Sequence, residues 1–439
     1  MAYRQNAPSR RVASLKRAAF RAIMDYMSIT VTAEKLTFGG DCIARVNGKA
    51  VFIPYAIPGE TLDIEIISSK RDYDKARIVS VCAPSPHRQI PACAYYGICG
   101  GCNMMHIDDA YQLSLRKSVL ADCFSRSGID IPGIDVIAGK SSGYRARFLL
   151  HDGGLIARDG KSIVPVTRCA VATDEVNAWF SETAFENRPH GLLRIFGDKK
   201  LVGSAEANGK KIVSAQCSKS ESTEEAVKTA AQNVHGKKIK TPPKRFSGTF
   251  SSPDTAVKIA IGGKEIGFDV RGFFQSNTDV LERAIEKVCT SLSGKNALDL
   301  YAGCGTFSVF LADTFEHVTL VEHNRDALVF AEQNMAGKNH ASFGVSGAAW
   351  VRDFAKTAPL FDAAVADPPR SGMEKEVCEW LCKSGIPHIR SLSCDPATHA
   401  RDAAKLIRSG YRLASLSLLD FYPNTCHIES LAIFEKRMK

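Results

Sequence analysis

Residues 298–306 read LDLYAGCGT, an apolar strand that runs into a glycine turn and then into a helix. Further strand-like stretches follow and alternate with helical stretches as far as the C-terminus; they are residues 317–321, 363–366 and 388–392. Strands and helices that alternate in this way form a parallel sheet covered by helices on both faces. The sequence therefore predicts a doubly wound, Rossmann-like α/β domain over residues 271–439.

The glycine turn predicts a ligand site at the carboxyl end of its strand. Gly303 and Gly305 let the backbone approach a ligand closely, and we count Thr306, the next residue, among the ligand contacts. Glu322 ends the following strand, where a carboxylate suits the two hydroxyls of a ribose. Ser308 stands where a dinucleotide-binding fingerprint has its third glycine. This difference favours S-adenosylmethionine, which has no phosphate to bind, and a tight turn without a ligand is the alternative.

The run DPPR at 367–370 follows the strand-like stretch 363–366, so it falls on the same carboxyl edge, where open α/β sheets bind ligands. A strand-end turn without a ligand is again the alternative. Asp353 lies in the chain between the two motifs. We expect it either to accept a hydrogen bond from the adenine amino group of the cofactor or to be a solvated acid.

A cysteine just past the strand 388–392 supplies the chemistry. Cys394 stands in SLSCDP at 391–396, and a cysteine thiolate is a strong nucleophile. Its addition to carbon 6 of a uracil makes carbon 5 carbanion-like, so that carbon 5 can take a methyl group. Glu429, in TCHIE at 425–429, is the candidate base for the carbon 5 proton. Taken singly, Cys394 also fits a core cysteine, and Glu429 fits a surface acid.

The run FFQSN at 273–277 precedes a helical stretch. Polar amides beside aromatic rings suggest a recognition edge with a stacking face, and we assign base stacking to Phe273. The alternative is a helix start with two core phenylalanines.

Three further segments precede the α/β domain. Residues 1–27 form a basic extension that we expect to be disordered. Residues 28–83 read as five short strands with an Asn47-Gly48 hairpin turn, which predicts a small β-barrel. Residues 84–270 form a mixed α+β segment, in which the polar stretch 205–250 is predicted to be peripheral, with one helix at 222–234.

Three cysteines of the central segment lie close together among glycines, at Cys93, Cys99 and Cys102. Fourteen cysteines in a chain without a secretion signal favour metal binding or catalysis over disulfides. Four thiolates are the usual ligand set of an iron–sulfur cluster, so a fourth ligand must come from elsewhere. A zinc site with His106 as a ligand, and no metal at all, are the alternatives.

Together these motifs resemble the TRAM-domain RNA uracil-5 methyltransferases, in particular the iron–sulfur members that modify large-subunit ribosomal RNA. The resemblance runs from about residue 28 to the C-terminus. It rests on five motifs in the family's order: FxQxN at 273–277, DLYxGxGTF at 299–307, DPPR at 367–370, SCDP at 393–396 and HxE at 427–429. Ala302 departs from the family, because many members carry a cysteine there.

The resemblance implies a TRAM-like barrel, an iron–sulfur domain and a methyltransferase domain. It implies that Cys394 is the nucleophile, that Glu429 is the base and that Cys169 is the fourth ligand of a [4Fe-4S] cluster. The implied contacts to S-adenosylmethionine are Gln275, Tyr301, Glu322 and Asp367.

The net charge of +10 agrees with an anionic partner, although about half of the excess lies in residues 1–27. We therefore expect a monomeric cytoplasmic enzyme that binds ribosomal RNA and no membrane. Methylation of a transfer RNA T-loop uridine is one alternative, and a non-catalytic RNA-binding protein with an inactive methyltransferase fold is the other.

Overall fold

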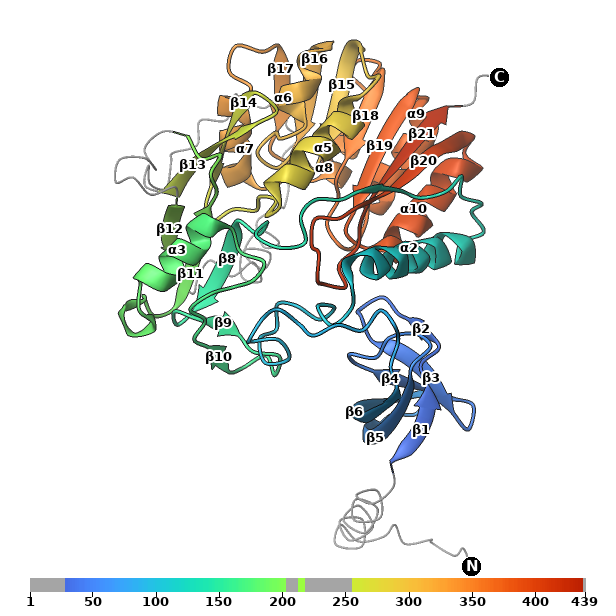
Figure 1. Ribbon diagram of the computed structural model, residues 1–439. Helices are drawn as coiled ribbons and strands as arrows, with labels where there is room; N and C mark the ends of the chain where they lie inside the picture. The colour runs from blue at the N-terminus through green and yellow to red at the C-terminus, as the bar shows by residue number, and fades with distance from the viewer. Residues whose placement is uncertain (1–27, 203–211, 218–254, 437–439) are drawn as a thin grey trace, which may run out of the picture. The chain divides into compact units, whose positions relative to one another are not determined.

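The computed structural model describes residues 28–202, 212–217 and 255–436 (Figure 1). The basic extension 1–27 and the helix expected at 222–234 lie outside these ranges. The chain forms two compact units. The described part of the first comprises residues 28–91 and 103–112, and the second contains Ala92–Cys102 and the described residues from Leu113 onward.

The first unit holds a six-stranded sheet with the order β1-β5-β6-β4-β3-β2. Its strands are β1 (Ile29–Thr32), β2 (Lys35–Leu36), β3 (Cys42–Val46), β4 (Lys49–Ile53), β5 (Thr61–Ser69) and β6 (Tyr73–Ala83). Asn47 and Gly48 have φ values of 51° and 79°, as a type I′ hairpin turn requires. The predicted barrel is borne out as a small β-sheet domain, and the structure adds β2, a two-residue strand that pairs with β3.

The central segment contributes two small sheets to the second unit. The first has the order β12-β11-β8, and β9 pairs with β10. The elements of this segment include α2 (Asp109–Arg126), β8 (Arg147–His151), β9 (Leu155–Ile156), β10 (Ile163–Val164), α3 (Asp174–Glu182), η1 (Phe185–Asn187), β11 (Leu192–Gly197) and β12 (Ile212–Cys217). Strand β12 falls inside the stretch 205–250 that the sequence predicted to be peripheral, and it pairs with β11 along its whole length.

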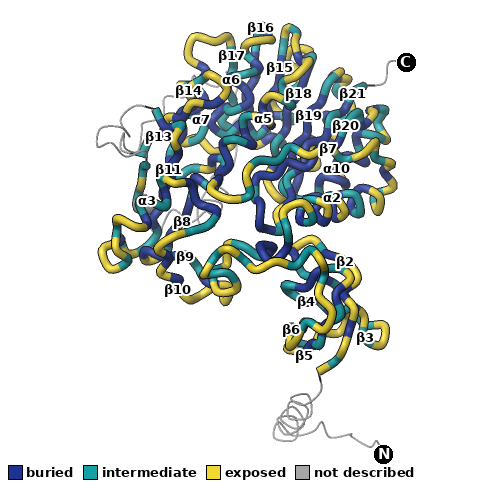
Figure 2. The backbone as a smooth tube through the Cα atoms, in the orientation of Figure 1, coloured by how far each residue is buried: buried dark blue, intermediate teal, exposed yellow. Residues whose placement is uncertain are grey.

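An eight-stranded sheet with the order β17-β16-β15-β18-β19-β21-β20-β7 carries the C-terminal part. Its strands are β7 (Asp135–Ile137), β15 (Gly294–Leu300), β16 (Phe315–Val321), β17 (His340–Phe343), β18 (Ala363–Ala366), β19 (His388–Ser393), β20 (Tyr411–Leu419) and β21 (Glu429–Lys436). The five strands from β17 to β19 are parallel, which confirms the predicted Rossmann-like sheet. Strand β18, AAVA, is buried throughout (Figure 2), as expected for a strand covered on both faces.

The far side of this sheet differs from the predicted parallel arrangement. Strand β21 runs antiparallel to both β19 and β20 and lies between them. Strand β7 pairs with β20, so the sheet also takes in a strand from outside residues 271–439.

The helices of this part begin and end at residues that suit those positions. They are α5 (Thr278–Cys289), α6 (Ser308–Leu311), α7 (Arg325–Asn334), α8 (Gly347–Asp353), α9 (Lys375–Ser384) and α10 (Pro396–Arg408). The side chains of Asn277, Asn324, Ser346 and Asp395 accept the first free N–H groups of their helices. Across the described ranges, no helix is long and apolar enough to cross a membrane.

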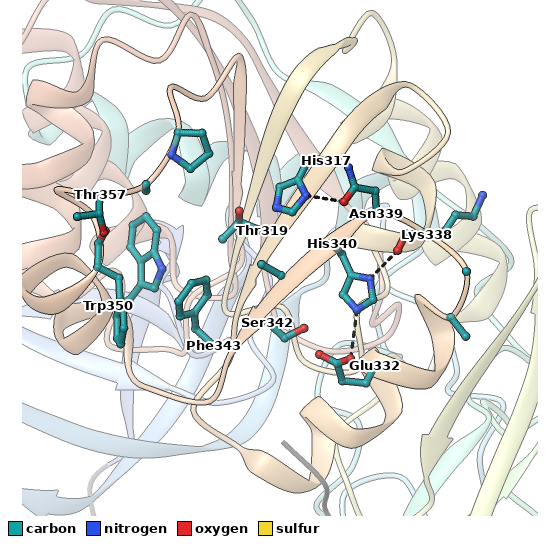
Figure 3. Close-up of a pocket in the computed structure, with 16 residues that line it drawn as sticks. His317, Thr319, Glu332, Lys338, Asn339, His340, Ser342, Phe343, Trp350 and Thr357 are labelled. Carbon is teal, nitrogen blue, oxygen red and sulfur yellow. Dashed lines mark hydrogen bonds and ion pairs between the residues drawn. The ribbon is translucent and has the colours of Figure 1, made fainter. Parts of the chain in front are cut away.

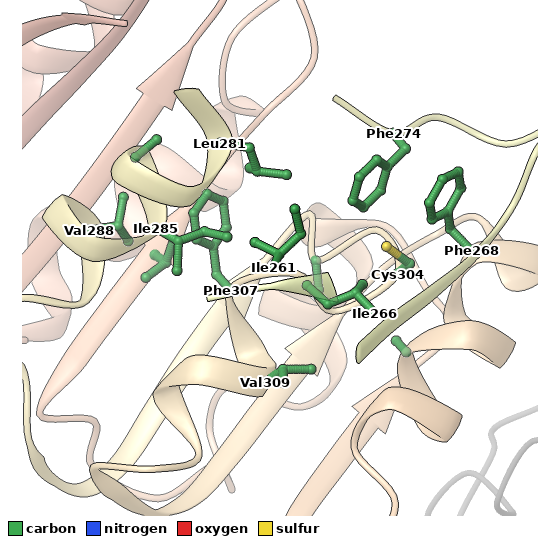
Figure 4. Packing of buried hydrophobic residues seen from close by; sticks show 14 of the residues in the cluster. Ile261, Ile266, Phe268, Phe274, Leu281, Ile285, Val288, Cys304, Phe307 and Val309 are labelled. Carbon is green, nitrogen blue, oxygen red and sulfur yellow. The ribbon is translucent and has the colours of Figure 1, made fainter. Parts of the chain in front are cut away.

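The hairpin of β13 (Ala256–Ile261) and β14 (Lys264–Asp269) shares a hydrophobic core with α5 and the glycine turn (Figure 4). The rings of Phe268 and Phe274 stack with their centroids 4.0 Å apart, and Cys304 of the glycine turn belongs to the same cluster. This compact core continues across residue 270, where the sequence placed a domain boundary.

Candidate functional site

The register of β19 and β21 brings the two expected catalytic residues together. Ser393, the last residue of β19, pairs with Ser430 of β21 in an antiparallel register. Cys394 and Glu429 are therefore the next residues along the two paired chains. Glu429 is the first residue of β21 and Cys394 is the first residue beyond β19, so the two backbones are adjacent at this point. The thiol and the carboxyl are thus neighbours at one edge of the sheet.

The electrostatics of this pair agree with a close approach of the two groups. Burial, followed by the charges of Glu429 and Asp367, raises the pKa of the Cys394 thiol to about 11. Burial, followed by the charge of Asp367, raises the pKa of the Glu429 carboxyl to about 8. Arg370 lowers the pKa of both groups. The free protein therefore holds a neutral thiol beside a carboxyl that titrates near neutral pH, a pattern common at catalytic sites.

Asp367 directly follows β18, whose parallel pairing with β19 sets the two strand ends beside each other. Burial raises the pKa of its carboxyl to about 6. Helix α10 fixes the loop that follows, because Thr398 donates to the Arg370 carbonyl at 3.3 Å and Asp402 accepts from the Met373 N–H at 2.9 Å. The DPPR loop and the Cys394 loop are therefore held by one helix.

The glycine turn has the form that the sequence predicted. Tyr301 has a φ of 63°, an uncommon conformation for a bulky residue, and the Gly303 N–H donates to Glu322 at 2.9 Å. Burial opposes ionisation of Glu322, but hydrogen bonds from His323, the Asn324 N–H and the Gly303 N–H outweigh it and lower the pKa. Glu322 is thus a buried carboxylate at the end of β16, directly beside the turn.

Ser308 has a role that the sequence did not reveal. Its hydroxyl donates to the Asp299 carboxyl at 2.5 Å, inside β15 and beneath the glycine turn. Asp299 is buried, and its other oxygen has no hydrogen-bond partner among the described residues. Burial raises its pKa to about 7, with the charges of Asp367 and Glu322 acting in the same direction and Ser308 opposing. The serine in the third-glycine position thus supports a buried acid below the ligand turn.

The FFQSN run divides between core and surface. Phe274 is buried, Phe273 is 70% exposed, and Asn277 caps α5. The Gln275 side chain accepts a hydrogen bond from the Tyr422 hydroxyl at 3.3 Å. Tyr422 is the residue that sequence reasoning missed here. Burial, then the charge of Glu429, raises its pKa to about 12, with Cys394 contributing further, so its ring links Gln275 to the Cys394–Glu429 pair.

Two expected cofactor contacts lie less centrally. The Thr306 hydroxyl is 3.4 Å from the Cys304 thiol within the glycine turn. Asp353 ends α8 and forms an ion pair with Arg352 at 2.8 Å, with 46% of its side chain exposed. This environment matches the solvated-acid alternative for Asp353.

The four expected cluster cysteines come together in the second unit. Burial, followed by the Cys169 thiol, raises the pKa of Cys102 to about 12, and Cys99 and Cys93 add to the effect. Arg145 lowers the pKa of Cys99, Cys102 and Cys169, so its guanidinium faces the group. In the described ranges, no three His, Cys, Asp or Glu side chains are arranged to hold a single metal ion.

The four thiols nevertheless suit an iron–sulfur cluster in kind and number. Thiolates around a four-iron cluster stand further apart than those around one metal ion. The four thiols here act on one another without converging on a single point, which agrees with that larger spacing. The loop that carries them packs tightly against β9, since a Cβ on Gly100 would lie 3.1 Å from the Ile156 carbonyl oxygen. His106, the alternative ligand, is buried in the first unit against the Tyr55 ring.

A hollow of about 980 Å³ lies elsewhere, along the edge strand β17 (Figure 3). His317, Glu332, His340 and Trp350 are among the residues that line it, and His340 pairs with Glu332 at 3.2 Å. None of the site residues expected from the sequence lines it. The candidate site is therefore the carboxyl edge of β15, β18 and β19, completed by β21.

Two sequence families match the chain. The TRAM domain family matches residues 26–79, and the tRNA (uracil-5-)-methyltransferase family matches residues 254–346 and 349–437. An RNA methyltransferase of Treponema denticola is 33% identical, and the match covers 92% of this chain and 98% of that protein. The 23S rRNA (uracil(1939)-C(5))-methyltransferase RlmD of Shewanella amazonensis is 30% identical and covers 93% of this chain and 95% of its own.

The chain belongs to the RNA (uracil-5-)-methyltransferase family.

A solved structure shares the architecture of this methyltransferase. The tRNA (uracil-54, C5)-methyltransferase of Pyrococcus abyssi, in complex with S-adenosyl-L-homocysteine, superposes with a TM-score of 0.66 at 20% identity. The match covers 92% of this chain and all of that chain. The predicted enzyme class is confirmed: the protein is an S-adenosylmethionine-dependent methyltransferase that acts on carbon 5 of uracil in RNA.

In this methyltransferase the residues that sequence reasoning missed share one property. Tyr422 and Arg145 each reach the site from loops, and their partners lie far away in the sequence. Arg145 also lowers the pKa of Tyr422 and of His427, so its charge acts on the four thiols and on the candidate site alike. An available signal was the density of aromatic and basic residues in YRAR at 144–147 and in FYPN at 421–424.

Proposed function

We propose that this methyltransferase modifies a uridine of 23S ribosomal RNA through a covalent bond between Cys394 and carbon 6 of the uracil, with Glu429 as the base. The observation that carries this proposal is the register of β19 and β21, which sets the thiol and the carboxyl side by side. The charge of Glu429 also raises the pKa of Cys394, which supports the same arrangement.

The residues would act in sequence, with atoms and charges balanced. The Cys394 thiol first loses its proton to solvent; the thiolate then adds to carbon 6, and the electron pair of the C5–C6 double bond moves toward the O4 oxygen as an enolate. S-adenosylmethionine supplies the methyl group to carbon 5 and leaves as S-adenosylhomocysteine. The Glu429 carboxylate takes the proton from carbon 5, the C5–C6 double bond forms again, and the bond from carbon 6 to sulfur breaks. The thiolate is released and the RNA carries 5-methyluridine.

The surrounding residues would position the two substrates. We assign the cofactor to the carboxyl edge, with contacts from Gln275, Tyr301, Thr306, Glu322 and Asp367. Glu322 carries a negative charge in a buried place, which suits a ribose diol. Phe273 projects from the surface next to Gln275, and its 70% exposure supports a role in stacking on an RNA base.

Ribosomal RNA is the substrate class that we favour. The 23S ribosomal RNA enzyme of Shewanella amazonensis is similar over 95% of its own length, and this chain carries a TRAM match at residues 26–79. The transfer RNA enzyme of Pyrococcus abyssi supports the fold alone at 20% identity. We assign the reaction to the cytoplasm because its substrate is ribosomal RNA.

We further propose that Cys93, Cys99, Cys102 and Cys169 hold a [4Fe-4S] cluster. Four thiols with no carboxylate among them support iron–sulfur ligation. Methyl transfer needs no electron, so the cluster would order the loops around it or contact RNA. The test is iron and acid-labile sulfide analysis, with absorption spectra, of protein purified without oxygen. About four irons per chain, lost in Cys169→Ser, would support the cluster, whereas bound zinc or no metal would exclude it.

Transfer of tritiated methyl groups to 23S ribosomal RNA and to transfer RNA tests the function. Wild type should label 23S ribosomal RNA at a single uridine, and Cys394→Ala should label neither RNA. Cys378→Ala is the matched control, because Cys378 is a buried cysteine of α9 away from the edge. Equal labelling by wild type and Cys394→Ala would exclude the covalent mechanism. Labelling of transfer RNA alone would show that transfer RNA is the substrate, and it would leave the proposed covalent mechanism unchanged.

A further inference from the structure

Helix α10 begins two residues after Cys394 and packs against β19, β20 and β21. One of its residues, His399, is only 2% exposed. Its ring meets Phe124 of α2 edge-on, with centroids 5.6 Å apart. A histidine in such an apolar place costs free energy unless its polar atoms find partners.

The hydrogen-bond partner of His399 lies on the residue pair next to Cys394 and Glu429. Its Nδ1 lies 2.7 Å from the Ser430 hydroxyl, and that hydroxyl lies 3.4 Å from the Ser393 carbonyl oxygen. Ser393 and Ser430 are the paired residues of β19 and β21 whose chain neighbours are Cys394 and Glu429. One buried side chain therefore joins α10 to both strands at the position next to the catalytic pair.

The imidazole is a neutral hydrogen-bonding group in this place. Burial lowers the pKa of His399 to about 4, and the Ser391 carbonyl acts in the opposite direction. Its Nε2 has no hydrogen-bond partner by distance and angle within the described ranges. An apolar side chain of similar size would fill the same space without leaving a polar atom unsatisfied. The fold alone therefore gives no reason for a histidine here, whereas the link to Ser430 does.

We propose that His399 is a positioning residue, which holds the ends of β19 and β21 in the register that places Cys394 beside Glu429. The inference rests on the proposed roles of Cys394 and Glu429. Its physical basis is that a small misplacement of reacting groups costs up to about a hundredfold in rate. His399 touches neither substrate, so its loss should lower kcat and leave the KM values for RNA and S-adenosylmethionine unchanged.

The experiment compares His399→Leu, Ser430→Ala, the double variant and His399→Asn. His399→Leu and Ser430→Ala should each lower kcat by about tenfold or more, at unchanged KM. The double variant should be no worse than the worse single variant, because both remove one link. His399→Asn, whose amide can donate or accept near the position of Nδ1, should recover most of kcat.

Leu406→Ala is the matched control, since Leu406 is buried in the same helix and has no polar link to either strand. It should lower the melting temperature as much as His399→Leu or more, yet keep kcat. The proposal is overturned if His399→Leu keeps wild-type kcat, if Leu406→Ala loses kcat equally, or if the losses of the double variant multiply. A fully active Cys394→Ala would instead overturn the covalent mechanism, so the two failures are distinct.

Discussion

Replacement of Glu429 by glutamine tests the proposed base directly. Glutamine keeps the shape of the side chain but cannot take a proton, so the Cys394–uracil adduct should form, receive its methyl group and then persist. General bases typically contribute about a hundredfold to ten-thousandfold to a rate, which is the expected slowing of adduct release.

The pKa of Glu429 gives this prediction a pH dependence. With a pKa of about 8, raised by burial and by Asp367, about 3% of the carboxyls are ionised near pH 6.5 and about 75% near pH 8.5. The wild-type adduct should therefore resolve about 25-fold faster at the higher pH. The adduct has already formed at this stage, so the ionisation of Cys394 does not enter. In Glu429→Gln the slow release should not vary over this range.

RNA carrying tritium at carbon 5 of uracil reports on this step, because removal of the proton releases tritium to water. Single-turnover samples on denaturing gels report the covalent complex in parallel. Wild type should release tritium in step with methylation, and Glu429→Gln should methylate and retain tritium in a protein-bound RNA. Glu435→Gln is the control, because Glu435 lies in the same strand and pairs with Arg412 at the surface. Tritium release from Glu429→Gln at the wild-type rate would refute the assignment.

Three stability predictions follow from buried charge. Because the pKa of Glu429 is raised in the folded protein, this residue destabilises the fold increasingly as pH rises from about 4.5 to about 8. In urea unfolding, Glu429→Gln should therefore be more stable than wild type by about 2–4 kcal/mol near pH 8 and equally stable near pH 4.5. Arg116 and Asp420 form a buried ion pair at 2.6 Å. In the same assay Asp420→Asn should lower the free energy of unfolding by about 3–5 kcal/mol, because it leaves a buried charge without its partner. The double variant Arg116→Met with Asp420→Leu should recover much of this loss. The buried Arg188 guanidinium donates to four backbone carbonyls. Thermal unfolding of Arg188→Met should therefore show a free energy of unfolding lower by about 2–4 kcal/mol. A loss below about 1 kcal/mol would contradict that role.

Local sequence patterns were sufficient for the strands and turns on which the site is built. The strand expected at 363–366 has these bounds in the structure, because a buried run between breaks is a local signal. The Gly303–Glu322 contact also follows from local order, since both residues stand at the ends of adjacent parallel strands.

The pairing of strands that lie far apart in the chain could not be predicted from the sequence. Apolar alternation in β20 and β21 is the same whether a strand runs parallel or antiparallel, so the hairpin that brings Glu429 to Cys394 left no directional signal. Strand β7 has three residues and pairs with a strand about 280 positions later, so only tertiary packing defines it. The contact of Tyr422 with Gln275 likewise spans 147 positions.

Because β21 lies between β19 and β20, the sheet has to be assembled in a fixed order as the chain is synthesised. The two flanking strands leave the ribosome first, but they do not pair with each other and must keep an open slot until β21 emerges. A nascent chain stopped before Glu429 has the proposed nucleophile, the glycine turn and the DPPR loop, yet lacks both the proposed base and the strand that fills the gap between β19 and β20. Entry of β21 therefore completes the sheet and brings Glu429 beside Cys394 in one step, and until then the open slot is the surface that a chaperone would need to shield.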